Sequence, residues 1–450
     1  MRRNNRRKFL KTMASLTGAG LFVPNVALLA KSAVFMKNQE KENIEETGSV
    51  YPGWKEGEMD LHFIYTGVGE SCFHIFPDGT TMLIDAGDRN TNAYKLNVTV
   101  LPDQSRHAGE WIARYIDRVH PKANEKTIDY LQLSHFHNDH GGGPDSFAEK
   151  TSGRGNDYYL SGLTQVGEFW KFRKGFDRGW PNDNKPVPIS DTECYDNFRR
   201  FIQWKVEHEE LQMEQFEVGR LDQIQLQYQP EKYDFHVRNI CGNGIVMKED
   251  GSGVIDCFEK YPKNKERINE NILSLGMVFA YGPFRFYTAG DVSGTLADDS
   301  GNRLNFEEMV GKAAGKVDVC KANHHSYRDA MTPEFVREVQ ATVYVIPVWD
   351  RLHTQDNTMT NMSSEELYAG KRTICSAQIE PEEQETFRNA DWMKNVAIAG
   401  GHIVVKVFDG GRQYKVYFLT ANDESMKIKT VLGPFASRCS NQSKPISQQN

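Results

Sequence analysis

The sequence predicts a mixed α/β protein whose functional residues lie at the ends of buried strands. Short apolar runs of strand length alternate with segments of helical spacing, and two halves each place strands before helices. Four of the predicted strands end in aspartate or histidine, side chains that commonly bind metal ions. The stretch 145–270, between the halves, lacks this rhythm.

The first half contains four predicted strands and one helix. Turn signals such as Pro77-Asp78-Gly79 separate its short apolar or alternating runs. Apolar residues recur at helical spacing over His107–Val119, and Pro121 closes this helix. The strands are expected at Asp60–Thr66, Cys72–Phe76, Thr81–Ile84 and Ile128–Ser134.

The second half repeats this arrangement and ends in a hairpin. Thr332 is a suitable N-cap for one of its helices, and Asp409-Gly410-Gly411 forms the hairpin turn. The expected strands are Asn271–Ala280, Phe284–Thr288, Val317–Ala322, Ala341–Val348, Ile403–Phe408 and Tyr414–Leu419, and the expected helices are Phe306–Val310 and Pro333–Val339.

The stretch 145–270 is interpreted as a large aromatic-rich insertion that covers the active face. A helix is expected over Asp191–Phe216, followed by strand-like pieces at Ile224–Tyr228 and Phe235–Ile240. Cys241 and Cys257 flank a predicted hairpin. Among seven cysteines without zinc-finger spacing, they are the best candidates for a disulfide in an exported protein.

The segment Leu131–Gly143, LQLSHFHNDHGGG, is the one around which the chain is organised. His135, His137, Asp139 and His140 fall within six residues, directly after a predicted strand. Four such side chains would repel one another or stay unsatisfied without a cation. Imidazole and carboxylate together suit zinc, manganese or iron, and Asp139 could hold a second ion beside the first.

Three further strand ends carry polar residues that can reach this loop. They are Asp85, Asp291 and the pair His324-His325. Loops at one edge of a sheet converge, and a carboxylate such as Asp291 can bridge two cations. Two cations lower the pKa of a bound water toward about 7 and neutralise charge on a substrate oxygen. The sequence has no GxSxG motif, so it does not indicate covalent catalysis by a serine.

HFHNDHGGG resembles the HxHxDH signature of the metallo-β-lactamase superfamily. LIDAGD at 83–88 and YTAGD at 287–291 resemble the other two markers of that superfamily, in the same order. VDVCKANHHS at 317–326 is similar to the branch of the competence DNA-uptake channel hydrolase domain and the teichoic-acid phosphorylcholine esterase. Over Met59–Ala421, interrupted by the insertion, the resemblance implies an αββα sandwich. It also implies hydrolysis and two divalent metal ions, with zinc favoured over manganese or iron.

The resemblance also implies the residues of the site. The metal ligands would be His135, His137, Asp139, His140, Asp291, His324 and His325, of which Asp139 and His325 are also the catalytic candidates. His135 and His137 would hold the first ion, Asp139 and His140 the second, and Asp291 would bridge the two.

The third ligand of the first ion is left open by the sequence. Many superfamily members have a histidine between the main motif and the bridging aspartate, where this chain has only His208 and His236. His208 falls in the acidic segment EHEE, and His236 in a strand-like piece without glycines. The twin histidines are favoured, His353 is a rival, and Asp85 is expected to orient a motif histidine. The histidines expected to be structural or exposed are His62, His74, His107, His120 and His402.

Residues 1–33 are interpreted as an export signal. The start, MRRNNRRKFLK, is basic without an acid, and the apolar stretch that follows is short and interrupted. Arg6-Arg7 resembles the twin-arginine signal, which implies the twin-arginine translocase as a partner and a periplasmic or extracellular location. An uncleaved basic anchor is the alternative. A linker at 34–58, a hydrolase domain at 59–430 and a flexible tail at 431–450 complete the predicted organisation.

Net charge limits the partners of the mature chain. The whole chain carries −7, and residues 1–33 hold seven basic residues and no acid, so the remainder carries −7 less 7, or −14. An acidic body is a poor platform for polyanionic DNA, and no stable nucleic-acid partner is expected.

The leading interpretation is an exported hydrolase of a phosphodiester or related phosphate ester, acting on a small molecule or an envelope polymer. A hydroxide held by two metals would attack phosphorus while the metals stabilise the developing charge. A lactonase, β-lactamase or thioesterase is the alternative among enzymes, because the same nucleophile attacks acyl carbon. A non-catalytic envelope-binding protein on the same fold is the alternative from another class.

Overall fold

The computed structural model describes residues 46–89, 99–143, 158–182, 189, 192–260, 268, 270–297 and 303–438. All of these residues belong to one compact unit, Glu46–Asn450. The predicted export signal at 1–33 and the first part of the predicted linker lie outside the described residues. Among the described residues, no helix has both the length and the apolar character needed to cross a membrane.

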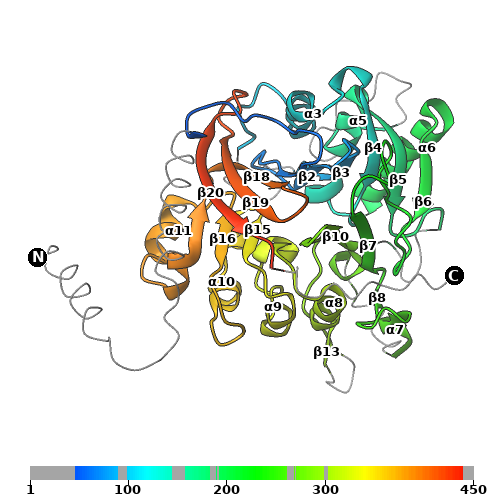
Figure 1. Cartoon of the computed structure of the whole chain (residues 1–450). Coiled ribbons are helices and arrows are strands. Elements are labelled where there is room, and N and C mark those ends of the chain that lie inside the picture. Colours follow the sequence, from blue (N-terminus) through cyan, green and yellow to red (C-terminus); the bar gives the residue numbers. More distant parts are fainter. Residues whose placement is uncertain are drawn as a thin grey trace, which may run out of the picture. The chain divides into compact units, whose positions relative to one another are not determined.

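The first of two nine-stranded sheets in the described part of the chain joins segments from both ends of the unit (Figure 1). In spatial order its strands are β20 (Ile428–Ala436), β19 (Gln413–Thr420), β18 (Gly401–Phe408), β1 (Met59–Phe63), β2 (Ser71–Ile75), β3 (Thr81–Ala86), β4 (Thr127–Gln132), β5 (Lys171–Asp177) and β6 (Gln212–Gln215). Pairing is antiparallel from β20 to β3 and parallel from β3 to β6.

The second sheet has parallel strands on one side and antiparallel strands on the other. In spatial order its strands are β17 (Val396–Ile398), β16 (Thr373–Ser376), β15 (Val343–Ile346), β14 (Val319–Lys321), β11 (Phe284–Ala289), β10 (Gly276–Tyr281), β7 (Phe235–Gly242), β8 (Ile245–Met247) and β9 (Val254–Asp256). Pairing is parallel from β17 to β11 and antiparallel from β11 to β9. A separate hairpin joins β12 (Thr295–Ala297) and β13 (Arg303–Asn305).

The helices of the described residues range from single turns to one of 18 residues. The α-helices are α3 (Ala108–Val119), α4 (Asn138–Gly141), α5 (Leu163–Phe169), α6 (Thr192–Glu209), α7 (Cys257–Lys260), α8 (Phe306–Ala314), α9 (Pro333–Val339), α10 (Asp356–Ser363) and α11 (Pro381–Thr386). The 3-10 turns are η2 (Ala123–Glu125), η5 (Glu270–Leu273), η6 (Asn323–Ser326), η7 (Arg351–His353) and η8 (Asp391–Asn395).

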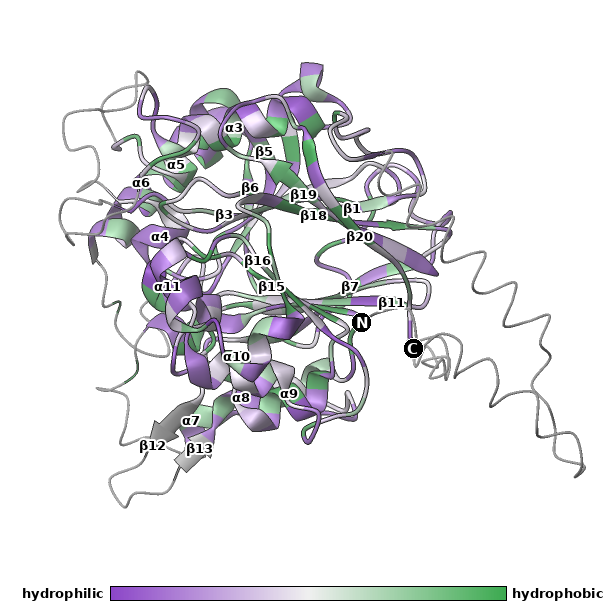
Figure 2. Ribbon diagram, turned by 90° about the vertical axis from the view of Figure 1, so that its left-hand side faces the viewer, coloured by the Kyte–Doolittle hydropathy of each residue, from purple (hydrophilic) through white to green (hydrophobic). Residues whose placement is uncertain are grey.

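The two sheets pack face to face, and helices cover their outer faces (Figure 2). Between the sheets, Phe63 from β1 and Phe286 from β11 meet edge to face, with ring centroids 6.0 Å apart. On the outer faces, Ile112 of α3 packs in the cluster of the first sheet, and Phe335 of α9 packs in that of the second. Strands that are buried on both faces have nearly continuous apolar sequences, which is why the sequence could indicate them. The predicted mixed α/β class is therefore confirmed, with its elements in helix, sheet, sheet and helix layers.

We expected the stretch 145–270 to be an insertion that covers the active face, but its described parts belong to the two sheets. Its described parts supply β5 and β6 to the first sheet and β7, β8 and β9 to the second. The predicted helix over Asp191–Phe216 is divided into α6 and β6, and Ile224–Tyr228 forms no strand. Cys241 is a free thiol, so the predicted disulfide with Cys257 is not formed. In β5, exposed Lys171 is followed by buried Phe172. Because this strand has no continuous apolar run, its sequence did not indicate a buried strand.

At both ends, the folded unit continues beyond the predicted domain boundaries of 59 and 430. The predicted linker includes Tyr51, which is buried and donates a hydrogen bond to Asp60 Oδ2 (2.7 Å). The predicted tail includes β20 from Val431 onward, and this strand pairs with β19 as far as Ala436. Gly433-Pro434 argues against a central strand, but β20 lies at the sheet edge, where proline is tolerated.

Candidate metal centre

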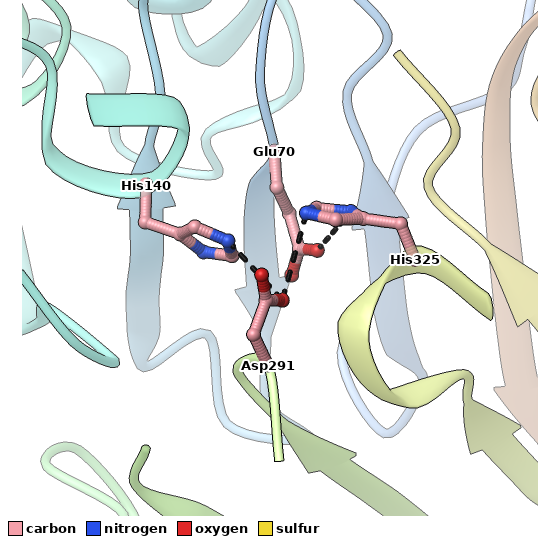
Figure 3. Close-up of side chains that lie close together, drawn as sticks. All are labelled: Glu70, His140, Asp291 and His325. Carbon is pink, nitrogen blue, oxygen red and sulfur yellow. Dashed lines mark ion pairs between the residues drawn. The ribbon is translucent and has the colours of Figure 1, made fainter. Parts of the chain in front are cut away.

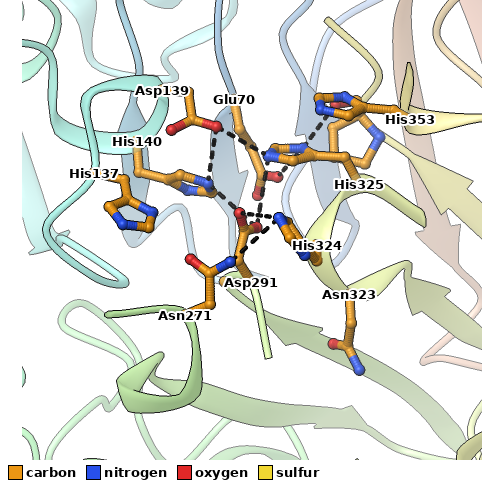
Figure 4. A network of polar contacts seen from close by, with 12 residues as sticks. Glu70, His137, Asp139, His140, Asn271, Asp291, Asn323, His324, His325 and His353 are labelled. Atoms are coloured by element: carbon orange, nitrogen blue, oxygen red, sulfur yellow. Dashed lines mark hydrogen bonds and ion pairs between the residues drawn. The ribbon is translucent and has the colours of Figure 1, made fainter. Parts of the chain in front are cut away.

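The loops that follow β3, β4, β11 and β14 meet at one place in the molecule (Figure 4). Because β3 pairs in parallel with β4, and β11 with β14, the carboxyl ends of each pair lie at the same sheet edge. The structure brings together the residues predicted as metal ligands: His135, His137, Asp139, His140, Asp291, His324 and His325.

The HxHxDH segment turns sharply after β4 and enters the single helical turn α4. The backbone N–H of His140 donates to the carbonyl oxygen of His137 (3.0 Å). This turn brings the rings of His135 and His140 side by side, with centroids 4.2 Å apart. A local backbone turn, rather than a long-range contact, therefore gathers the motif histidines, which is why the spacing alone could identify them.

Asp291 lies at the centre of the cluster, and its two carboxylate oxygens face different histidines (Figure 4). Oδ1 lies 3.2 Å from His140 Nε2 and 3.5 Å from His325 Nε2. Oδ2 lies 3.7 Å from His324 Nε2 and 3.9 Å from His135 Nε2. The twin histidines are thus divided between the two oxygens of one carboxylate.

The two remaining predicted ligands each join one side of this carboxylate. Asp139 Oδ2 lies 3.4 Å from His325 Nε2, and we call Asp139, His140 and His325 the Oδ1 set. His137 Nδ1 lies 3.0 Å from His135 Nε2, and we call His135, His137 and His324 the Oδ2 set. Each set contains three donor side chains in addition to its oxygen of Asp291.

Three carboxylates behind the cluster face Nδ1 of its histidines, and Nδ1 of His325 also lies 3.1 Å from the carbonyl oxygen of Pro347. The pairs are Asp85 with His140 (2.8 Å), Asp329 with His324 (2.7 Å) and Glu70 with His325 (3.2 Å). A carboxylate on Nδ1 favours the proton there and leaves Nε2 to face the cluster, the arrangement common to metal-binding histidines. Asp85 occupies the orienting position that the sequence predicted for it.

The twin histidines reach the cluster through an unusual backbone turn. His324, His325 and Ser326 all have left-handed φ angles, of 43°, 49° and 66°. Each such residue costs on the order of 1–3 kcal/mol, so the surrounding structure has to hold the turn in place. The Tyr287 hydroxyl donates a hydrogen bond to Asn323 Oδ1, and Asn323 Nδ2 donates one to Oε1 of Glu307 in α8. Each of these hydrogen bonds is 2.8 Å long.

Glu70 is the main site residue that the sequence analysis missed. Together with His140, Asp291 and His325 it forms a buried group that could hold a metal ion (Figure 3). Its Oε1 also lies 2.9 Å from Nζ of Lys321, which is fully buried. We interpret Glu70 as an orienting group because it faces Nδ1 of His325. The sequence shows only an acid in a glycine turn, Gly67-Val68-Gly69-Glu70, which is a weak signal.

Burial and the dense packing of charges shift the pKa values of the cluster in opposite directions. Burial alone would raise the pKa of Asp291, but His325 and His140 outweigh it and hold the pKa well below its usual range. Burial lowers the pKa of His135, and the neighbouring His140 lowers it further. Burial opposes protonation of His325, but Asp291, Asp139 and Glu70 raise its pKa to about 9. The site therefore already places positive charge beside the central carboxylate.

The donor set fits a cation, as judged from its buried polar atoms. His140 Nε2, Asp291 Oδ1 and Glu70 Oε2 are buried and make no hydrogen bond, although each is in ion-pair contact: the first two with one another, and Glu70 Oε2 with Nδ1 of His325. Buried polar atoms normally have partners, and a cation would provide one. Imidazole nitrogen and carboxylate oxygen are suitable ligands for zinc, manganese or iron.

The rival histidines lie outside the two sets. His236 lies on β7 opposite Ala280, and His208 stacks on Trp204 in α6. His353 stacks on His325 with ring centroids 4.4 Å apart, so it lies next to the Oδ1 set without joining it. His324 supplies the third histidine of the Oδ2 set, a position that neither His236 nor His353 occupies.

No family model matches the chain, and no curated protein matches it significantly. The geometry of the site therefore carries the functional argument.

Proposed function

We propose that the chain is an exported, metal-dependent hydrolase with a metallo-β-lactamase fold, acting on a phosphodiester or related phosphate ester. The observation that carries this proposal is the division of four histidines between the two oxygens of Asp291, with His137 beside one pair and Asp139 beside the other. The helix, sheet, sheet and helix layers, with the cluster at the strand ends, support the fold.

Two divalent cations would be held by the two sets, with Asp291 between them. The Oδ2 set would supply His135, His137 and His324, and the Oδ1 set Asp139, His140 and His325. When bound, such a pair supplies Lewis acidity, which makes water acidic and neutralises charge on the substrate. Zinc is the favoured metal because the donors are mostly imidazole.

The chain itself would orient the reacting groups. Asp139 Oδ1 lies 3.8 Å from the Arg89 guanidinium, which leaves Oδ2 directed toward His325. In this position the carboxylate can accept a proton from the nucleophile. His325, whose Nδ1 faces Glu70 and the carbonyl oxygen of Pro347, would hold the cation of the Oδ1 set through Nε2 and so position it rather than transfer a proton.

A phosphate ester is favoured over an acyl substrate because a cationic group borders the site. Arg89 has 28% of its side chain exposed and lies over the Trp349 ring, 5.3 Å from its centroid. A guanidinium is the donor best suited to phosphate oxygens. The similarity of the twin-histidine segment to the phosphorylcholine esterase branch supports the same substrate class.

The test is a panel of esters offered to purified, metal-loaded protein. We expect hydrolysis of aryl phosphodiesters or phosphocholine esters, and we expect Asp139→Ala to abolish it. Opening of lactams, lactones or thioesters with no phosphodiesterase activity would contradict the proposed substrate class. Bound metal without any hydrolysis would favour the non-catalytic binding protein.

A further inference from the structure

Asn271 extends the cluster on the side of the Oδ2 set. It lies in η5, directly before β10, and only 5% of it is exposed. Its Nδ2 lies 3.2 Å from Nε2 of His324, and Figure 4 shows the amide directed at the cluster. Its Oδ1 is buried and makes no hydrogen bond. An amide oxygen in this state is a polar atom without a partner, beside a group of cation ligands.

The backbone around Asn271 is tied to the centre of the site. The next turn places Ser274, whose hydroxyl accepts a hydrogen bond from the backbone N–H of Asp291 (2.9 Å). On the other side, Glu270 forms a fully buried ion pair with Arg178 (2.6 Å). These two contacts hold η5 against the bridging carboxylate, so the position of Asn271 is fixed and only its amide can turn.

The hydrogen bond between Asn271 and His324 is incompatible with a cation on His324. Asp329 accepts from Nδ1 of His324, so Nε2 carries the lone pair that accepts from the Asn271 amide. A cation needs that same lone pair. Once a cation binds this lone pair, the N–H of Asn271 points at a positive charge. A half-turn of the amide replaces the N–H with oxygen, and this breaks no hydrogen bond of Oδ1 because it has none.

We propose that Asn271 is an oxygen ligand of the cation held by the Oδ2 set, and that its amide exchanges nitrogen for oxygen when that cation binds. This inference rests on the proposed two-cation site. Amide oxygens coordinate hard and borderline cations, so the exchange adds one neutral ligand to three histidines and a shared carboxylate oxygen.

The experiment compares cation binding by wild type, Asn271→Ala, Asn271→Asp and the matched control Asn422→Ala, in an exposed bend after β19. Zinc is titrated into metal-free protein against a chromophoric chelator, and cobalt is titrated to record its visible absorption. We expect Asn271→Ala to weaken one of two sites by about 10- to 100-fold and to change the cobalt spectrum. Asn271→Asp, which keeps an oxygen, should bind at least as tightly as wild type, and Asn422→Ala should match wild type.

Three results would overturn the inference. Wild-type affinity and spectrum in Asn271→Ala would show that the amide is no ligand. Equal losses in Asn271→Ala and Asn271→Asp would show that it acts as a hydrogen-bond donor to His324. Fewer than two cations in wild type would refute the two-cation site itself, and only this third result contradicts the proposed function. Thermal unfolding of the metal-free proteins checks that each variant is folded.

Discussion

At the scale of single residues, the chemistry of the site depends on which ring nitrogen of each histidine carries the proton. Asp85, Asp329 and Glu70 face Nδ1 of their histidines and so direct Nε2 inward. Asp85 and Glu70 are buried, whereas Asp329 has 43% of its side chain exposed. Asp329 can therefore be removed with the least disturbance of the core.

Asp329→Ala should weaken the Oδ2 set while the protein stays folded. Without the carboxylate, His324 loses the acceptor that fixes its tautomer, and we expect about a 10- to 100-fold loss in affinity for one cation. Isothermal titration of metal-free protein with zinc measures this effect. Asp423→Ala, in an exposed turn, is the control. Unchanged affinity for both cations would show that Asp329 does not orient His324.

At the scale of elements, α8 holds the left-handed turn that carries the twin histidines. Glu307 of α8 is fully buried and accepts hydrogen bonds from Asn323 Nδ2 (2.8 Å) and from the backbone N–H groups of Met331 and Thr332 (2.7 Å each). One carboxylate thus holds both ends of the segment that contains His324 and His325. Burial, only partly offset by these donors, raises its pKa to about 7.

Glu307 should make the metal-free protein less stable as the pH rises. Because its folded pKa lies above the unfolded value of 4.5, the unfolded state loses the proton first. The free energy of unfolding therefore falls by up to about 3 kcal/mol as the pH rises from 4.5 through 7. Glu307→Gln should flatten this dependence, although it also loses an acceptor. Parallel pH profiles of wild type and variant in urea unfolding would contradict the assignment.

At the scale of the whole molecule, the core between the sheets contains a histidine surrounded by aromatic rings. His74 of β2 is fully buried among Phe63, Phe279 and Phe286, and neither ring nitrogen has a hydrogen-bond partner. Burial lowers its pKa to about 3, so it stays neutral in the folded protein. It was expected to be structural or exposed, and it is structural.

His74→Leu should stabilise the protein, and more so in acid. Below its unfolded pKa of 6.5, wild type loses about 1.4 kcal/mol per pH unit at this position, because only the unfolded state takes up the proton. We expect the variant to gain about 2 kcal/mol more at about pH 5 than at about pH 8. Urea unfolding at both values measures the gain, with exposed His208→Leu as control. An equal gain at both pH values would show that His74 does not titrate on unfolding.

The sequence could predict the elements that are locally determined and much of the site. The HxHxDH histidines converge through one backbone turn, and β1 to β4 are buried runs, so short-range patterns sufficed. Glu70 could not be found, because its role depends on contacts with Lys321 and His325 from the other sheet. The edge strand β20 and the mixed-polarity strand β5 lack a continuous apolar pattern, and both were assigned to other structures.

The count of bound metal ions tests the central claim most directly. The two sets share Asp291, so we expect two equivalents of divalent metal in wild type and no more than one in Asp291→Asn. The measurement is elemental analysis of protein that has been loaded with zinc and then freed of excess metal. Two equivalents in wild type with a loss in Asp291→Asn would support a shared carboxylate between two cations. One equivalent or none in folded wild type would contradict the two-cation site.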